Sequence, residues 1–215
     1  MLSDYNTIMP KRNSIKVYGA DQYYHIYNRG VAKQDIFREA SDYYYFLSLF
    51  KRHLSPEQAV DSAGRKIVSY RDEVDLVAFC LMPNHFHLLC YLKQPDGIIT
   101  LMRSVMTAYT MYFNKKYGRT GGLYEGVFLA SRITNDAYLW HVTRYIHLNP
   151  MDLGRDYRSY PYSSLGYFAG TSHASWLAAN RLVESSKDQT EYLEFVADYE
   201  TMHQDMKLLK NLLAD

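Results

Sequence analysis

The chain has 215 residues, of which 47% are hydrophobic and 22% are charged, with 24 basic and 23 acidic side chains and a formal net charge of +1. Such a chain can bury one sizeable core, with room for a small appendage. It contains no run of eighteen apolar residues, and residues 1–16 are polar, so we expect neither a transmembrane helix nor a secretion signal. Cys80 and Cys90 lie in apolar sequence and are expected to stay reduced in the cytoplasm.

The small net charge hides an uneven distribution. Residues 184–215 carry eight acidic side chains and three lysines, a net charge of −5, so the total of +1 leaves +6 on the rest of the chain. A basic body suits a polyanionic partner, although this excess alone does not indicate nucleic acid. The 22 tyrosines could stack on the bases of a single strand, but most tyrosines in a globular domain pack inside it.

The spacing of apolar residues predicts four strands and three helices. In chain order these are a strand at 22–28, a helix at 43–53, strands at 74–81 and 85–92, a helix at 98–117, a strand at 126–133, and a helix that Asn135 or Asp136 caps and that ends at Asn149. The first six elements match a ferredoxin-like α+β fold, an antiparallel sheet with helices on one face. RNA-binding RRM domains share this arrangement, so the fold leaves the chemistry open.

The most informative stretch joins two predicted strands through Met82-Pro83-Asn84 and continues as His85-Phe86-His87. Side chains alternate along a strand, so both histidines point to one face and Phe86 points to the core. Two imidazoles side by side on a strand suit a divalent metal. Two polar residues on an exposed face would give the same pattern, and this motif alone does not separate the two interpretations.

A second stretch forms the end of the last predicted helix, which closes before Pro150. Tyr145 and Asn149 are four residues apart and therefore share one face of that helix. This face can offer a phenol and an amide oxygen together. Tyr138, seven residues before Tyr145, lies on roughly the same face.

With these motifs, the chain resembles the single-tyrosine HUH transposases, and in particular the branch called REP-associated tyrosine transposases. The motifs that carry the resemblance occur in the family's order over roughly residues 20–168. They are Tyr24-His25-Ile26-Tyr27-Asn28-Arg29-Gly30, Met82-Pro83-Asn84-His85-Phe86-His87, Gly126-Val127-Phe128 and Arg144-Tyr145-Ile146-His147-Leu148-Asn149-Pro150. Many insertion-sequence members carry Gln where this chain has Asn149, and the REP-associated branch has Asn there.

The resemblance implies an enzyme that cuts and rejoins single-stranded or hairpin DNA, including REP palindromes, through a 5′-phosphotyrosine bond and a free 3′-hydroxyl. Tyr145 would be the nucleophile, with Tyr138 as the fallback. His85, His87 and Asn149 would hold Mg²⁺ or Mn²⁺. A set of basic residues is expected to contact the DNA: Arg29, Lys115, Lys116, Arg119, Arg132, Arg144, Arg155 and Arg158.

We expect three regions, namely a basic arm at 1–20, an HUH transposase-like catalytic domain at 21–168, and an acidic helical appendage at 169–215. The family exchanges helices in dimers, so Tyr145 could meet the histidines of its own chain or of a partner in a homodimer. The loop at 160–164, which reads Tyr-Pro-Tyr-Ser-Ser, is expected to help hold DNA or to pack against the chain.

Two other functions fit parts of the sequence. A protein with the same fold could bind nucleic acid without catalysis, as a regulator. A protein that has lost its enzymatic activity would not need His85, His87, Tyr145 and Asn149 together. A metal-dependent phosphohydrolase of the His-x-His-x-His type would need a third histidine where this chain has Leu89.

Overall fold

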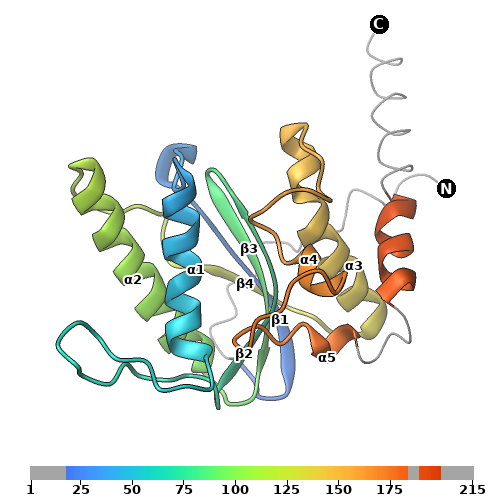
Figure 1. Cartoon of the computed structure of the whole chain (residues 1–215), viewed down its shortest axis with the longest axis horizontal. Coiled ribbons are helices and arrows are strands. Elements are labelled where there is room, and N and C mark those ends of the chain that lie inside the picture. The colour runs from blue at the N-terminus through green and yellow to red at the C-terminus, as the bar shows by residue number, and fades with distance from the viewer. Residues whose placement is uncertain (1–17, 184–188, 200–215) are drawn as a thin grey trace, which may run out of the picture.

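The computed structural model describes residues 18–183 and 189–199 and shows a sheet flanked by helices (Figure 1). Most of the expected arm (1–17) and the end of the tail (200–215) lie outside the described residues. No helix in the described part of the chain is long and apolar enough to cross a membrane. The strands are β1 (Gln22–Arg29), β2 (Val74–Met82), β3 (His85–Leu92) and β4 (Leu129–Arg132); the helices are α1 (Ala40–Leu54), α2 (Gly97–Tyr117), α3 (Asp136–Leu148), α4 (Leu165–Phe168) and α5 (Asn180–Val183), with 3₁₀ turns η2 (Val31–Lys33) and η3 (Asn149–Leu153).

The four strands form one antiparallel sheet in the order β2-β3-β1-β4. With α1 after β1 and α2 after β3, this is the order of a ferredoxin-like fold, and the predicted fold class is confirmed. α1 and α2 cover one face of the sheet, as expected for the first six elements (Figure 1). The seventh element, α3, covers the opposite face, where its Tyr145 ring meets the His87 ring of β3.

Side-chain alternation on β3 divides its residues between these two layers. Phe86, Leu88 and Cys90 are completely buried, and the Phe86 ring lies 5.3 Å from the ring of Phe46 in α1. The histidines before and after Phe86 point to the α3 side, as the sequence predicts. The core on the α1 side therefore determines which side chains β3 offers to α3.

The two cysteines are free and buried thiols, as expected. In the pairing of β2 with β3, Cys80 lies opposite His87 and Cys90 lies opposite Leu76, so the register keeps the two sulfur atoms on different cross-strand pairs.

The strand expected at 126–133 is shorter than predicted and covers only Leu129–Arg132. The residues that precede Leu129 form hydrogen bonds with the last residues of β1 instead of pairing along that strand. Glu125 N donates to Arg29 O at 2.9 Å, and Asn28 Nδ2 donates to Gly126 O at 3.0 Å. These bonds turn the segment across the strand end before regular pairing begins.

Asp42 anchors the start of α1 and connects it to α2. Its carboxylate is fully buried and forms a capping box with Glu39, so the helix begins at Ala40, slightly before the predicted start. From α2, Lys116 Nζ lies 2.6 Å from Asp42 Oδ1, and Tyr117 OH donates to Asp42 Oδ2 at 2.7 Å. The buried charge is therefore paired and hydrogen-bonded.

The chain beyond α3 covers the edge of β2. Ser163 forms a β-bridge with Cys80, and Tyr160 OH donates to Leu81 O at 2.8 Å. The Oγ of Ser164 accepts from Phe79 N at 2.8 Å. The loop at 160–164 therefore packs as an edge cover, the second of the two interpretations open from its sequence.

The described part of the acidic appendage docks on α3. Residues 189–199 are helical. Buried His147 places its Nε2 2.7 Å from Ser164 Oγ, and its Nδ1 bonds to Tyr192 OH. The Arg144 guanidinium lies over the rings of Phe195, at 4.1 Å, and Tyr199, at 4.4 Å. α3 is thus held by the sheet on one side and by the appendage on the other.

We predict that Asp42→Asn lowers the free energy of unfolding by about 3 kcal/mol in urea titrations, because it leaves Lys116 without its buried partner. Desolvation raises the pKa of Asp42, but hydrogen bonds from Lys116, two backbone amides and Tyr117 together hold it below its usual value. The native protein should therefore lose this stabilisation as the pH falls below about 4, whereas Asp42→Asn should not. The matched control is Asp61→Asn in the exposed Asp61–Arg65 pair, which should cost less than about 1 kcal/mol. Equal effects of the two substitutions would contradict the buried-pair account.

Candidate active site

Two histidines of β3 form one wall of the candidate site. His85 is the first residue of the strand and is partly buried, whereas His87 is 6% exposed. Their rings lie 5.1 Å apart at an angle of 85°. His85 Nδ1 is 2.6 Å from Asn84 Oδ1 in the β2–β3 turn, which orients the ring at the strand end.

Helix α3 supplies the other wall. Its first turn is capped by Asn135, whose side chain accepts from Tyr138 N at 2.8 Å. Burial of an apolar stripe that includes Ile146 then turns Tyr145 toward β3, where its ring lies 5.3 Å from that of His87. Within this single chain, Tyr145 therefore lies beside the histidines of β3. Tyr138, the fallback nucleophile, lies two helical turns earlier.

Asn149 follows the last residue of α3 and is 3% exposed. Its Nδ2 donates to the Tyr145 carbonyl at 2.8 Å, which holds the side chain against the helix end. Its side chain is also hydrogen-bonded to His85 and to the Tyr145 hydroxyl. The four residues expected to form the site therefore meet at one place, where β3 begins and α3 ends.

Burial sets the protonation states in this site. It lowers the pKa of His85, and it lowers that of His87 further, with His25 and His85 adding to the effect. Burial also raises the pKa of Tyr145 to about 12, and Asp152 acts in the same direction. At neutral pH the histidines are therefore neutral and the phenol is protonated. Neutral imidazoles can bind a metal, while the phenol needs a nearby positive charge to become a phenolate.

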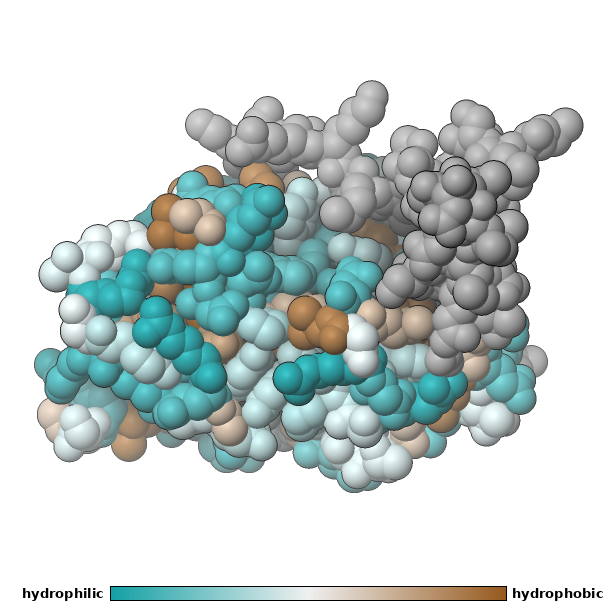
Figure 2. All heavy atoms as spheres, turned by 90° about the horizontal axis from the view of Figure 1, so that it is seen from above, coloured by the Kyte–Doolittle hydropathy of each residue, from teal (hydrophilic) through white to brown (hydrophobic). Residues whose placement is uncertain are grey.

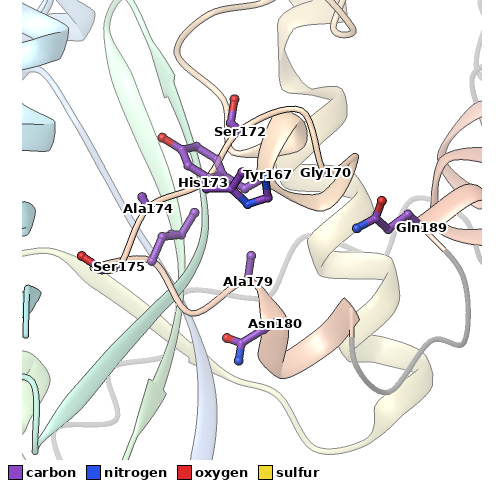
Figure 3. A pocket seen from close by; sticks show the side chains of 10 residues that line it. Tyr167, Gly170, Ser172, His173, Ala174, Ser175, Ala179, Asn180 and Gln189 are labelled. Atoms are coloured by element: carbon purple, nitrogen blue, oxygen red, sulfur yellow. The ribbon is translucent and has the colours of Figure 1, made fainter.

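A small cavity of about 150 Å³ opens beside these residues and is lined by Tyr145, Asn149, Asp152 and Tyr199, among others. A larger hollow of about 600 Å³ lies at the loop between α4 and α5 (Figure 3). It is lined by side chains such as Tyr167, His173 and Asn180, and contains none of the four residues of the site. Of these two cavities, only the small one adjoins Tyr145 and Asn149.

The donor atoms of the site fit a divalent metal. Two neutral imidazoles supply nitrogen, and Asn149 can supply its Oδ1 because its Nδ2 already donates to the Tyr145 carbonyl. Within the described residues no group of three or more His, Cys, Asp and Glu side chains could hold a metal. The ligand set expected here contains only two side chains of these types, His85 and His87, together with Asn149. Water and substrate oxygens would take the remaining coordination positions of the metal.

The basic residues expected to contact DNA are not all near the site. Arg29 on β1 lies opposite His85 on β3 in the strand register, and its guanidinium donates to the Glu125 carboxylate at 3.0 and 3.1 Å. Arg132 pairs with Tyr24 on β1, so its exposed side chain lies on the α1 side of the sheet, away from the histidines. The structure thus brings Arg29 to the site and does not bring Arg132.

The other expected DNA contacts differ in how strongly they are held within the chain, and Arg119 and Arg158 also contact neighbouring side chains, Asn114 and Asp156 respectively. Lys116 is bound to Asp42 and Glu39, and Arg144 is stacked on Phe195 and Tyr199, so both are engaged within the chain. Lys115 and Arg119 lie at the C-terminal end of α2, and Arg155 and Arg158 lie after η3. The C-terminal ends of α2 and α3 and the β2–β3 turn lie at the upper end of Figure 1, and the view onto this end shows mainly hydrophilic side chains with separate small hydrophobic patches (Figure 2).

Two residues near the site were not predicted. His25 of β1 is 2% exposed, and its Nε2 lies 2.9 Å from His87 Nδ1. Asp152 in η3 lines the cavity with Tyr145. The alternation of β1 places His25 and Tyr27 on one face, but it does not say which strand lies beside them.

The comparisons with known proteins agree with the ferredoxin-like fold and with the resemblance drawn from the motifs. The sequence profile described as Transposase IS200 like matches residues 51–149, the segment that holds His85, His87, Tyr145 and Asn149. This segment is therefore similar in sequence to the IS200-like transposases, and the resemblance expected from the motifs is confirmed.

A solved structure of a REP-associated tyrosine transposase bound to a REP hairpin has the same fold. It is 15% identical in sequence, with a TM-score of 0.52, over 74% of this chain and 87% of that chain. No protein with a curated description matches the sequence significantly.

We predict that Arg29 and Arg144 respond differently to charge removal. Arg144→Met should loosen the helix at 189–199, seen as faster amide hydrogen exchange there, and should leave the salt dependence of DNA binding unchanged. Arg29→Met should weaken DNA binding and reduce the slope of log K against log salt by about 1, as expected for one lost phosphate contact. An equal loss of salt slope in Arg144→Met would instead make that residue a DNA contact.

Proposed function

We propose that this transposase cleaves single-stranded or hairpin DNA with Tyr145 as the nucleophile and with Mg²⁺ or Mn²⁺ held by His85, His87 and Asn149. The observation that carries the proposal is the meeting of α3 with β3. The Tyr145 ring lies 5.3 Å from the His87 ring, and Asn149 is hydrogen-bonded to both Tyr145 and His85. A nucleophile beside a set of metal ligands is the arrangement that phosphodiester cleavage requires.

In the proposed reaction, the Tyr145 hydroxyl oxygen attacks the phosphorus of the scissile phosphodiester. A bond forms between that oxygen and phosphorus, and the bond from phosphorus to the 3′-oxygen breaks. The phenol loses its proton and the departing 3′-oxygen gains one, so the products are a 5′-phosphotyrosine and a free 3′-hydroxyl. One phosphate ester replaces another, so a second 3′-hydroxyl can reverse the step and join strands without an external energy source.

The residues of the chain prepare this reaction. The neutral His85 and His87 offer nitrogen lone pairs, and Asn149 holds the Tyr145 hydroxyl by a hydrogen bond that lowers its pKa. When bound, the metal supplies positive charge that neutralises the phosphate and favours the phenolate over the phenol, whose pKa of about 12 is raised by burial. The Arg29 guanidinium, next to His85, adds a cation for a flanking phosphate.

A DNA hairpin is the substrate form to test first, because the solved relative was captured with a REP hairpin. Exposed Lys115, Arg155 and Arg158 and half-buried Arg119 are the remaining basic residues proposed to hold the DNA backbone. We also propose a homodimer, although the four residues of the site already meet within one chain. A regulator without catalysis would not need these four residues together, and Leu89 is completely buried where a phosphohydrolase would need a third histidine.

We predict that the protein forms a covalent adduct with a labelled hairpin in Mn²⁺, seen as a labelled protein band on a denaturing gel. Tyr145→Phe should abolish the band because it removes the attacking oxygen, and the native protein should lose it in a metal chelator. Tyr138→Phe is the matched control, since it removes a hydroxyl from the same helix and should leave the band unchanged.

Binding of the same hairpin should persist in Tyr145→Phe, because the basic residues proposed to hold the DNA backbone are unchanged. If the band survives in Tyr145→Phe but disappears in Tyr138→Phe, the nucleophile is Tyr138 and the proposed assignment is wrong. Binding without any band in the native protein, across hairpins from the host genome, would favour the non-catalytic regulator.

A further inference from the structure

His25 is the buried neighbour of a proposed metal ligand. In the β1–β3 register His25 lies opposite Leu89, one position along the same face from the pair formed by Tyr27 and His87. The His25 and His87 rings are stacked with centroids 5.0 Å apart and an angle of 23°. Their closest nitrogens, His25 Nε2 and His87 Nδ1, are 2.9 Å apart. Two imidazoles at this distance and burial share a hydrogen bond.

This hydrogen bond has two possible directions, and they differ in what His87 can do. If His87 Nδ1–H donates to His25 Nε2, the opposite nitrogen of His87, Nε2, keeps a free lone pair that can bind a metal. If His25 Nε2–H donates to His87 Nδ1, the proton of neutral His87 sits on its Nε2 and blocks that lone pair. Only the first direction is compatible with His87 as a metal ligand.

In the first direction, the proton of neutral His25 lies on its own Nδ1. Among the described residues, His25 Nδ1 has no hydrogen-bond partner, although it is buried. The Oγ of Ser131 is likewise buried without a partner, and Ser131 is the residue opposite His25 on β4. A serine hydroxyl can donate or accept, so Ser131 suits either form of His25 Nδ1, and the direction follows from the free lone pair that His87 Nε2 needs in order to bind a metal.

We propose that His25 is a positioning residue that accepts a hydrogen bond from Nδ1–H of His87 and thereby fixes the tautomer and ring orientation in which His87 Nε2 binds the divalent metal. The proposal rests on the proposed function of the same site. Partners of this kind raise the affinity of a metal-binding histidine, and their loss costs about 10–100-fold in metal affinity.

The first test measures Mn²⁺ binding to the full chain by electron paramagnetic resonance, without DNA. His25→Leu removes the acceptor and should weaken Mn²⁺ binding by about 10–100-fold. His25→Gln keeps an oxygen near the position of Nε2 and should bind Mn²⁺ much more tightly than His25→Leu. Circular dichroism and thermal unfolding of both variants without metal show whether the fold is kept.

Native-like Mn²⁺ affinity in a folded His25→Leu variant would overturn the proposal. Equal, complete loss of binding in folded His25→Leu and His25→Gln would also overturn it, because His25 would then be a ligand itself. Saturating Mn²⁺ should restore adduct formation by His25→Leu, since Tyr145 is untouched.

A second test needs no variant that could misfold. Nitrogen-15 NMR of the histidine side chains in the metal-free native protein, assigned with His87→Gln, reports which nitrogen of His87 carries the proton. We expect the proton on Nδ1, and a proton on Nε2 would overturn the proposal. A different result would contradict the proposed function, namely that the native protein binds Mn²⁺ but forms no covalent DNA adduct at Tyr145.

Discussion

The antiparallel pairing of β1 with β3 is the constraint on which the site depends. It places His25 beside His87 and Arg29 beside His85 on one face, while Phe86 and Leu88 fill the core on the other. Side chains alternate with a period of two, so a slip of one residue would exchange these two faces. Burial of each large apolar side chain contributes roughly 1.5–3 kcal/mol, so the core opposes such a slip. The face that carries the proposed site is thus held in register by the core residues on the opposite face.

The site also requires that α3 stays at a fixed distance from the sheet and does not rotate about its own axis. The inner side of the helix packs on β2 and β3 through residues such as Ile146. Its outer side is attached through His147 to Ser164 and Tyr192, and through Arg144 to the helix at 189–199. Ser164 in turn bonds to β2 at Phe79. Tyr145 therefore stands on a helix that is supported from both sides, which suits a nucleophile that must meet a phosphate at a defined angle.

Much of the site could be predicted from local patterns. Alternation along a strand shows that His85 and His87 share a face, and a spacing of four residues shows the same for Tyr145 and Asn149. Both patterns hold because they depend only on the geometry of one element. The ferredoxin-like fold could be predicted for a related reason, since the order of strands and helices restricts how a sheet can connect.

The features that local patterns could not predict are contacts between segments distant in sequence. His25 lies beside His87 because of the register between β1 and β3. The sequence pattern of either strand alone does not reveal that register. The partners of Arg144 are Phe195 and Tyr199, which follow it by some fifty residues, so the expectation that Arg144 contacts DNA could not take them into account. Lys116 was likewise expected to face DNA, but the buried charge of Asp42 on α1 attracts it. The strand at β4 is short because its preceding residues bond to the end of β1.

The central claim is that one chain assembles the whole site, with Tyr145 acting beside its own histidines. The most direct measurement mixes two inactive variants, Tyr145→Phe and His87→Ala, and tests the mixture for a covalent adduct with a DNA hairpin in Mn²⁺. The account predicts that the mixture stays inactive, because every chain then lacks one part of its own site. An adduct in the mixture would show that Tyr145 of one chain works with the histidines of another and would contradict the account.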